Sequence, residues 1–313
     1  MNTLLTLERL RRVTPFGVRF VDDQGGRVIA EGLRATAWPS AEPSRTVPLR
    51  LNGSNVYYLL DAPGLRDLSW GEGDDAYWSG LSRRLGFTIQ VDDLGGRFLP
   101  FRFTADLPRR GLMRLACGSP LNPVPLPAGA ESDGVPLFTA PARPSTPGTV
   151  VLRADLWDAA NSVPAAWAVL NARTPGSVLR GEPPKRAIAD HRGRVALHFP
   201  FPDERDFDGG SFDSPSGSSG APLSARTWLV DLSADYGRLS VAPGTEKYAA
   251  PPIPDLCAAL TQPAARLWDR LGGAPLQLTT ISMRFGQETV LKSSATGAAP
   301  PSVVLLTPSL SPP

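Results

Sequence analysis

Hydrophobic and polar residues alternate with a period of two in the first third of the chain. In LRATAW, Leu33, Ala35 and Ala37 fall on one face, whereas the residues between them fall on the other. This is the pattern of a strand with one buried face. Short apolar runs of the same kind lie between residues 14 and about 110, namely VRFV, NVYYLL, FTIQV and FLPFRFTADL. The pattern predicts a β domain.

A short acidic and glycine-rich motif recurs between these runs. VDDQGGRV at 21–28 returns as VDDLGGRF at 91–98 and, more loosely, as ADHRGRV at 189–195. All three copies share D-x-x-G-R and an apolar residue, but the third lacks the paired acids, so the shared feature is turn geometry. We predict hairpin turns in which Asp23, Asp93 and Asp190 accept backbone N–H groups, and in which glycine supplies the backbone freedom at 26, 96 and 193.

The second half repeats the strand pattern after a proline-rich connector. Residues 117–148 hold eight prolines and no apolar period, which is typical of a semi-rigid linker. VVLRADLWD, AWAVLNAR, AIADHRGRVALHFPF and TWLVDLSADYG follow as predicted strands. We therefore predict a mostly β protein with two β-sandwich domains, at 1–116 and 149–249, joined by the linker at 117–148.

Residues 250–313 are predicted to form a C-terminal appendage of one helix plus strands. DLCAALTQPAARLWDRLGG is the best helix candidate, with Asp255 as N-cap and Gly272 as stop, and Pro263 should kink or split it. The end, SVVLLTPSLSPP, carries no charged side chain. We expect this uncharged segment to dock on a partner, so that removing 303–313 would abolish binding to a complex and leave both domains folded.

Composition excludes several classes of function. The 313 residues carry 32 Lys and Arg against 30 Asp and Glu, so no strong field attracts nucleic acid or an anionic membrane. No apolar window is long enough for a membrane span, and the first residues lack a secretory pattern. We expect a chain made in the cytoplasm. With Pro 34 and Gly 30, long helices are disfavoured. Only Cys117 and Cys257 occur, far apart, and we expect them to be reduced or simply buried.

Candidate chemistry is weak. Asp206, Asp208 and Asp213 could converge on a hard cation, but the spacing does not close a calcium shell, so a solvated loop is the simpler interpretation. His191 and His198 are the two histidines, and no G-x-S-x-G elbow or nucleotide-binding loop accompanies them. We predict no catalytic residue, no cofactor and no metal site.

One loop is rich in aromatic and acidic residues. Glu72, Asp74 and Asp75 lie between Trp70 and Trp78 in DLSWGEGDDAYWSG. Tryptophans stack on sugars, and paired carboxylates hydrolyse them, so a carbohydrate-binding or hydrolytic role stays open. The competing interpretation is that both tryptophans cover the core or an interface.

The strand and turn motifs resemble those of a known group of modules. VRFVDDQGGRVIAEGLRATAWP followed by NVYYLLDAPGL is similar to a transthyretin-type or carboxypeptidase-regulatory-like β-sandwich, and residues 150–202 resemble a second one. The resemblance covers about two-thirds of the chain and implies non-catalytic spacers, docking surfaces or assembly joints. The whole chain also resembles accessory proteins of phage-tail-like contractile injection systems.

The leading hypothesis is therefore a non-enzymatic structural subunit of a large assembly, such as a baseplate or cap component of a contractile injection particle. Its partners would be other protein subunits, and it would be oligomeric within a released or membrane-docked particle. The alternative is a carbohydrate-binding or adhesion module that uses Trp70 and Trp78.

Overall fold

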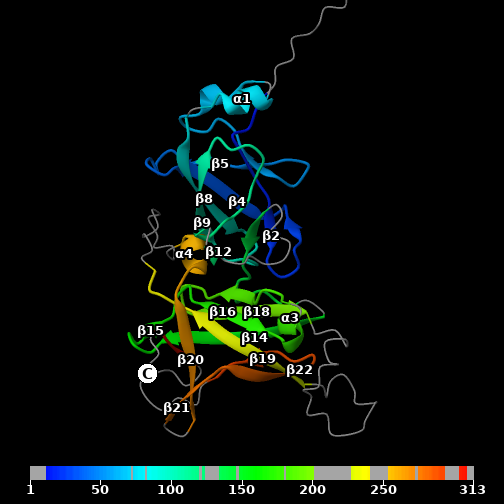
Figure 1. Ribbon diagram of the computed structural model, residues 1–313, viewed down its shortest axis with the longest axis vertical. Coiled ribbons are helices and arrows are strands. Elements are labelled where there is room, and N and C mark those ends of the chain that lie inside the picture. Colours follow the sequence, from blue (N-terminus) through cyan, green and yellow to red (C-terminus); the bar gives the residue numbers. More distant parts are fainter. Residues whose placement is uncertain are drawn as a thin grey trace, which may run out of the picture.

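The fold is mostly β and consists of two domains stacked along the long axis of the molecule (Figure 1). The computed structural model describes residues 12–71, 73–81, 83–119, 122–123, 134–145, 148–179, 181–200, 227–239, 253–271, 274–292 and 303–308. None of the helices in these residues is long and apolar enough to cross a membrane.

Three small sheets form the body of the N-terminal domain. The first has the order β5 (Val47–Pro48), β4 (Leu33–Pro39), β8 (Leu85–Asp93) and β9 (Phe101–Leu107). The second has the order β10 (Leu112–Met113), β1 (Phe16–Val18), β7 (Tyr57–Leu59) and β6 (Arg50–Leu51), and the third has the order β13 (Val135–Leu137), β2 (Phe20–Asp22) and β3 (Val28–Ile29). A 3₁₀ helix, η1 (Arg66–Ser69), the short α1 (Asp75–Ser79) and the pair β11 (Gly118–Ser119) and β12 (Asn122–Pro123) complete the domain.

The predicted alternation is confirmed in β4. Leu33, Ala35 and Ala37 are buried, whereas Arg34 is exposed. These side chains join a core that also contains Phe87, Ile89 and Phe103 from the neighbouring strands β8 and β9. The period of two therefore places one face of this sheet on the core.

The second domain is built around two long strands. On one side, β14 (Thr149–Asp158) pairs with β18 (Arg194–Pro200), β15 (Val163–Pro164), β23 (Thr289–Val290) and β24 (Val304–Thr307), and β24 continues to β20 (Ala264–Leu271) and β21 (Ala274–Gln277). On the other side, β19 (Thr227–Asp235) pairs with β16 (Val169–Arg173) and β22 (Thr280–Arg284), and β16 pairs with β17 (Lys185–Ile188). The short α3 (Pro175–Leu179) follows β16. Strand β20 also pairs with β19 and so links the two groups.

The region 255–271 differs from the single helix that the sequence predicts. Asp255 does cap a helix, because its side chain accepts the Ala258 N–H, but this helix, α4, covers only Leu256–Leu260. The residues after Pro263 form strand β20, in which Leu267 and Trp268 are buried. Proline ends the helix, and pairing with β24, β21 and β19 then outweighs the helical preference of the following residues.

The uncharged end of the chain is an internal strand. Val304, Leu305 and Leu306 are buried in β24, which lies between β14 and β20. The expectation that this segment docks on a partner is therefore wrong for residues 303–307. Its apolar residues are instead covered by this chain's own second domain.

Part of the predicted linker also belongs to a sheet. Strand β13, in the middle of 117–148, runs parallel to β2, with Val135 opposite Phe20 and Leu137 opposite Asp22. Val135 and Leu137 are fully buried in the N-terminal core. The N-terminal domain thus extends beyond residue 116.

The two domains share hydrophobic core. The cluster that fills the N-terminal domain also contains Trp167, Val169 and Ile188 from the second domain. Helix α4 adds Leu256, Ala259 and Leu260 to the same cluster, and the Arg102 N–H of strand β9 donates to the Pro254 carbonyl just before the helix. The chain therefore returns to the N-terminal domain at α4 before β20 resumes the second domain.

Candidate functional site

The second and third copies of the repeated motif are capped turns, as predicted. The Asp93 side chain is inaccessible to solvent and accepts the backbone N–H groups of Arg97 and Phe98, and the Arg97 guanidinium lies 2.8 Å from it. Asp190 accepts the N–H groups of Arg192 and Arg194 at 2.8 and 3.0 Å. Gly96 and Gly193 have the positive φ that these turns require.

The first copy has a different geometry. The Gly26 N–H donates to the Asp22 carbonyl, four residues back, whereas Gly96 and Gly193 donate to a carbonyl only three residues back. The Gln24 N–H donates to the Asp22 carboxylate. The capping acid is thus Asp22, and the prediction that Asp23 caps this turn is wrong. Asp23 is released to face the second domain.

A network of arginines lies where the first turn meets the connector. Arg143 places Nη2 2.7 Å from Asp22 Oδ2 and stacks over the Phe98 ring at 4.8 Å. Arg153, from β14 of the second domain, donates to the carbonyls of Pro141 and Arg143 and pairs with Glu288 at 2.8 Å. The connector between the domains is thereby held from both sides.

Two buried ionisable groups lie at this domain contact, and both favour their neutral forms. Burial raises the pKa of Asp23, and the negative charge of Asp22 and a hydrogen bond with its side chain raise it further, against the opposing effect of Arg143. Burial, followed by the charges of Arg153 and Arg143, lowers the pKa of His198 to about 4. His198 is only 2% exposed.

The aromatic loop of the N-terminal domain lies at the opposite end of that domain, around α1 (Figure 1). Trp70 is 48% exposed, and the Arg12 guanidinium lies 5.0 Å from the centre of its ring. Trp78 is half-buried; its indole N–H donates to the Gly73 carbonyl and its ring meets Tyr77 edge-on. Only Trp70 therefore presents a largely open indole.

The acidic residues of this loop that the structure describes have structural partners. Asp74 caps α1 by accepting the Tyr77 N–H, and Asp75 pairs with Arg110 at 2.5 Å. Glu72 lies outside the described residues. The carboxylates that are described thus hold the loop in place, and neither pairs with the other across an open site.

Those remaining sequence candidates that the structure describes do not form a cluster. Asp206, Asp208 and Asp213 lie outside the described residues, and no group of three metal-binding side chains occurs in the described part of the chain. His191 lies in the Asp190 turn, whereas His198 is buried on β18.

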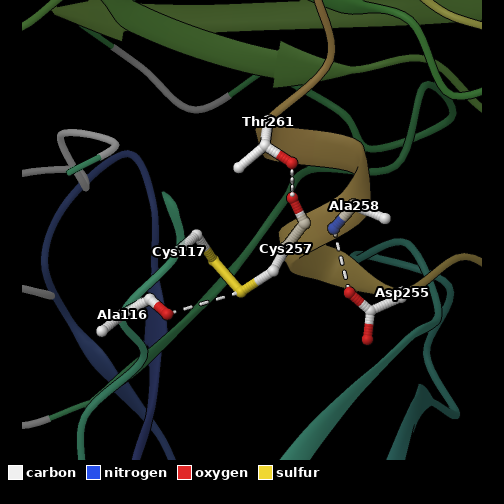
Figure 2. The surroundings of a disulfide bond; sticks show 6 residues. All are labelled: Ala116, Cys117, Asp255, Cys257, Ala258 and Thr261. Atoms are coloured by element: carbon white, nitrogen blue, oxygen red, sulfur yellow. Dashed lines mark hydrogen bonds between the residues drawn. A yellow bond between two sulfur atoms is a disulfide. The ribbon is translucent and has the colours of Figure 1, made fainter. Parts of the chain in front are cut away.

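The cysteines form a disulfide, so the expectation that they are reduced or simply buried is wrong, although Cys117 is buried. Cys117 and Cys257 have Cα atoms 5.0 Å apart, although 140 residues separate them in the sequence. Figure 2 shows the bond joining the segment after β10 to helix α4, where Asp255 caps the first turn and the Thr261 hydroxyl donates to the Cys257 carbonyl. Closing so long a loop contributes about 5 kcal/mol in the chain-entropy treatment.

Sequence reasoning missed Arg143, Arg153 and the disulfide. Arg143 lies in a proline-rich segment with no apolar period, and Arg153 is one charged residue within a strand. Their partners are distant in sequence, so local patterns give no signal for them. The only available signal was the even number of cysteines.

Comparison with known proteins does not place the chain in a family. No protein-family model matches it, and neither does any curated protein. A crystal structure from Bacteroides ovatus, described as a "putative adhesin", aligns over 88% of this chain and 97% of its own, with 11% identity and a TM-score of 0.18. A likeness at that level supports no conclusion about fold or function.

Proposed function

We propose that this chain is a non-enzymatic structural subunit that holds two β domains in a fixed arrangement within a larger protein assembly. The observation that carries the proposal is the joint between the domains. The shared core and the Arg153 hydrogen bonds to the Pro141 and Arg143 carbonyls cross it, and the disulfide fixes α4, which leads into β20 of the second domain, to the N-terminal domain. Two domains that close on a substrate need a mobile hinge between them. A structural spacer instead benefits from a rigid joint.

The tip around Trp70 is the proposed contact with a partner subunit. Tryptophan and arginine are among the residues most enriched at the hot spots of protein–protein interfaces. Arg12 also pairs with Asp61 at 2.5 Å, so the Arg12 side chain is already positioned over the ring. Less conformational entropy is then lost when a partner binds.

The disulfide adds a condition to this proposal. Disulfides persist mainly in oxidising compartments, so the assembled protein would function outside the reducing cytosol. A released particle meets this condition. We accordingly retain a phage-tail-like contractile injection particle as the proposed assembly, on the strength of the resemblance described above.

Co-purification tests the assembly role. We expect the tagged chain, expressed in its native host, to sediment with a large complex, and we expect Trp70→Ala to reduce recovery of that complex at least tenfold. Leu94→Ala is the matched control, because Leu94 is 71% exposed on a hairpin away from the tip. A wild-type chain that sediments alone would refute the proposal.

A carbohydrate-binding or adhesion role is the second candidate, and the exposed indole of Trp70 favours it. The partial burial of Trp78 argues against a two-tryptophan platform. A glycan array discriminates between the two candidates. Saturable sugar binding that Trp70→Ala abolishes supports adhesion, whereas a negative array with an intact complex supports assembly.

A further inference from the structure

Two of the buried polar atoms at the contact between the domains have no hydrogen-bond partner in the described part of the chain. They are Oδ1 of Asp23 and Nε2 of His198. Asp23 follows strand β2 of the N-terminal domain, and His198 lies on β18 of the second domain. An unsatisfied buried polar atom costs about 1–3 kcal/mol, so a native contact with two of them calls for an unseen partner.

Both side chains line the same small cavity. Its other walls come from Gln24 and from residues 183–186 at the start of β17. The cavity has a volume of about 10 Å³ for a water-sized guest, which is close to the minimum for one water molecule. It is too small for a sugar, a nucleotide or a peptide side chain.

The cavity lining combines the apolar rings of Pro183 and Pro184 with the polar side chains of Asp23 and His198, and these polar groups distinguish it from a packing defect. An apolar void of this size stays empty, whereas a site with polar groups on opposite walls holds an ordered water. Lys185 and Arg186 on one wall disfavour a cation. The Asp22 carboxylate, next to Asp23, disfavours an anion. A neutral molecule that can both donate and accept hydrogen bonds fits the walls best.

We propose that one water molecule occupies this cavity, joins the Asp23 carboxyl group to the His198 imidazole, and makes the contact between the two domains sensitive to pH. When both side chains are neutral, the water can hydrogen-bond to Asp23 Oδ1 and to His198 Nε2 at the same time, because water both donates and accepts. No net charge is then buried at the contact. Protonating His198 or ionising Asp23 places an unpaired charge at the contact and weakens it.

The surrounding charges reinforce this preference. Arg143 and Arg153 oppose a positive charge on His198, while Asp22 and Glu288 favour it, and burial and the arginines prevail. Asp22 opposes a negative charge on Asp23, while Arg143 favours it, and burial and Asp22 prevail. Lys185 and Arg186 add positive charge on the β17 wall, which opposes a charge on His198 but favours one on Asp23, where burial and Asp22 outweigh it. The neutral pair is therefore the stable state of the contact.

The sign of each effect follows from the direction of the pKa shift. Between pH 6.5 and about 4 the unfolded chain protonates His198 before the folded protein does, so stability falls as the pH falls through this window. Asp23 in the folded protein keeps its proton above the ordinary aspartate pKa, so stability falls as the pH rises through the raised value. His198 thus lowers the stability of the folded protein at low pH, and Asp23 lowers it at high pH.

Histidine NMR on the intact, oxidised chain tests the electrostatic part directly. The protein has two histidines, so His191→Gln leaves one imidazole signal, from His198. We expect that signal to titrate near pH 4. A midpoint near the ordinary value of about 6.5 would overturn the proposal.

Denaturation as a function of pH tests the consequence for the joint. We expect His198→Gln to remove most of the loss in unfolding midpoint between pH 7 and pH 4, while His191→Gln keeps it. Asp23→Asn, which mimics the protonated acid, should raise the midpoint at pH 8 and leave it unchanged at pH 4. Parallel curves of unfolding midpoint against pH for all variants would refute a pH-sensitive contact. If His198→Gln does not fold, the curve of Asp23→Asn alone still tests the proposal.

A high-resolution crystal structure at pH 7 tests the water itself. Density within hydrogen-bond distance of both Asp23 Oδ1 and His198 Nε2 supports the proposal. An empty cavity, or one filled by a metal ion, overturns it. These measurements do not depend on the assembly partner, so they can fail or succeed independently of the proposed function.

Discussion

The glycines of the second and third turns share a positive φ but differ in their surroundings. Gly96 has φ 64° and open space where a Cβ atom would lie. Gly193 has φ 77°, and a Cβ atom there would lie 2.3 Å from the Leu156 carbonyl oxygen. The Leu156 N–H also donates to the Gly193 carbonyl at 2.8 Å. The third turn is therefore packed against strand β14 at its glycine, whereas the second turn leaves open space at Gly96.

Alanine substitutions at these two glycines should separate the cost of backbone conformation from that of packing. Gly96→Ala imposes only the left-handed conformation on an alanine and should cost about 1 kcal/mol of unfolding free energy. Gly193→Ala must in addition displace the backbone at Leu156, and we expect it to lower the unfolding free energy by about 3 kcal/mol or more. Urea denaturation of both variants measures the difference. Equal losses would contradict the close contact between Gly193 and β14.

Residue-level prediction from sequence succeeded where a contact is local. Asp93 and Asp190 bind N–H groups two to five residues away, and the D-x-x-G-R pattern encodes that distance. The prediction that Asp23 caps the first turn was wrong because residues of the second domain, distant in sequence, set the environment of its side chain. A one-residue difference in the turn, which the shared letters do not reveal, turns that side chain toward His198 and its cavity.

Strands were predictable from sequence where neighbours in the chain also pair in the sheet. Strands β8 and β9 are joined by the second turn, and their alternation identifies them. By contrast, β13 and β24 pair in parallel with strands more than a hundred residues away. A parallel pair has no hairpin turn between its strands, so these segments resembled a linker and a tail.

The burial of β24 predicts that the end of the chain is essential for folding. Leu306 has 0% exposure, so Leu306→Ala should cost about 2–5 kcal/mol. Leu276→Ala, at a leucine that is 56% exposed on β21, should cost less than about 0.5 kcal/mol.

Thermal unfolding of the two leucine variants measures this difference. Removing residues 303–313 should unfold the second domain, contrary to the expectation from sequence. A truncated chain with unchanged unfolding would show that β24 contributes nothing to the fold.

At the scale of the whole molecule, the joint between domains combines covalent and noncovalent contacts. The disulfide anchors α4 to the segment after β10, and the same helix contributes Leu256 and Leu260 to the shared core. Sequence could not reveal this arrangement, because disulfide formation depends on two Cα atoms lying within about 7 Å in the folded state. The predicted division into separate domains and a linker therefore underestimated how the two halves are joined.

Reduction should weaken the whole molecule. Opening a loop of this length costs up to about 5 kcal/mol, so we expect a large decrease in the unfolding midpoint with a reducing agent. The double variant Cys117→Ser, Cys257→Ser should show the same decrease without reductant and no further change with it. Unchanged stability in both experiments would show that packing alone holds α4 in place.

The bond between Cys117 and Cys257 also changes how the chain responds to cutting. Every peptide bond from residue 118 to residue 256 lies inside a covalent ring. A protease that cuts once in this ring leaves a molecule of unchanged mass, apart from one added water, which separates into two pieces only after reduction. Gel electrophoresis with and without reductant would therefore reveal nicked molecules that remain joined. Such a ring keeps the protein in one covalent piece after a cut that would divide an open chain.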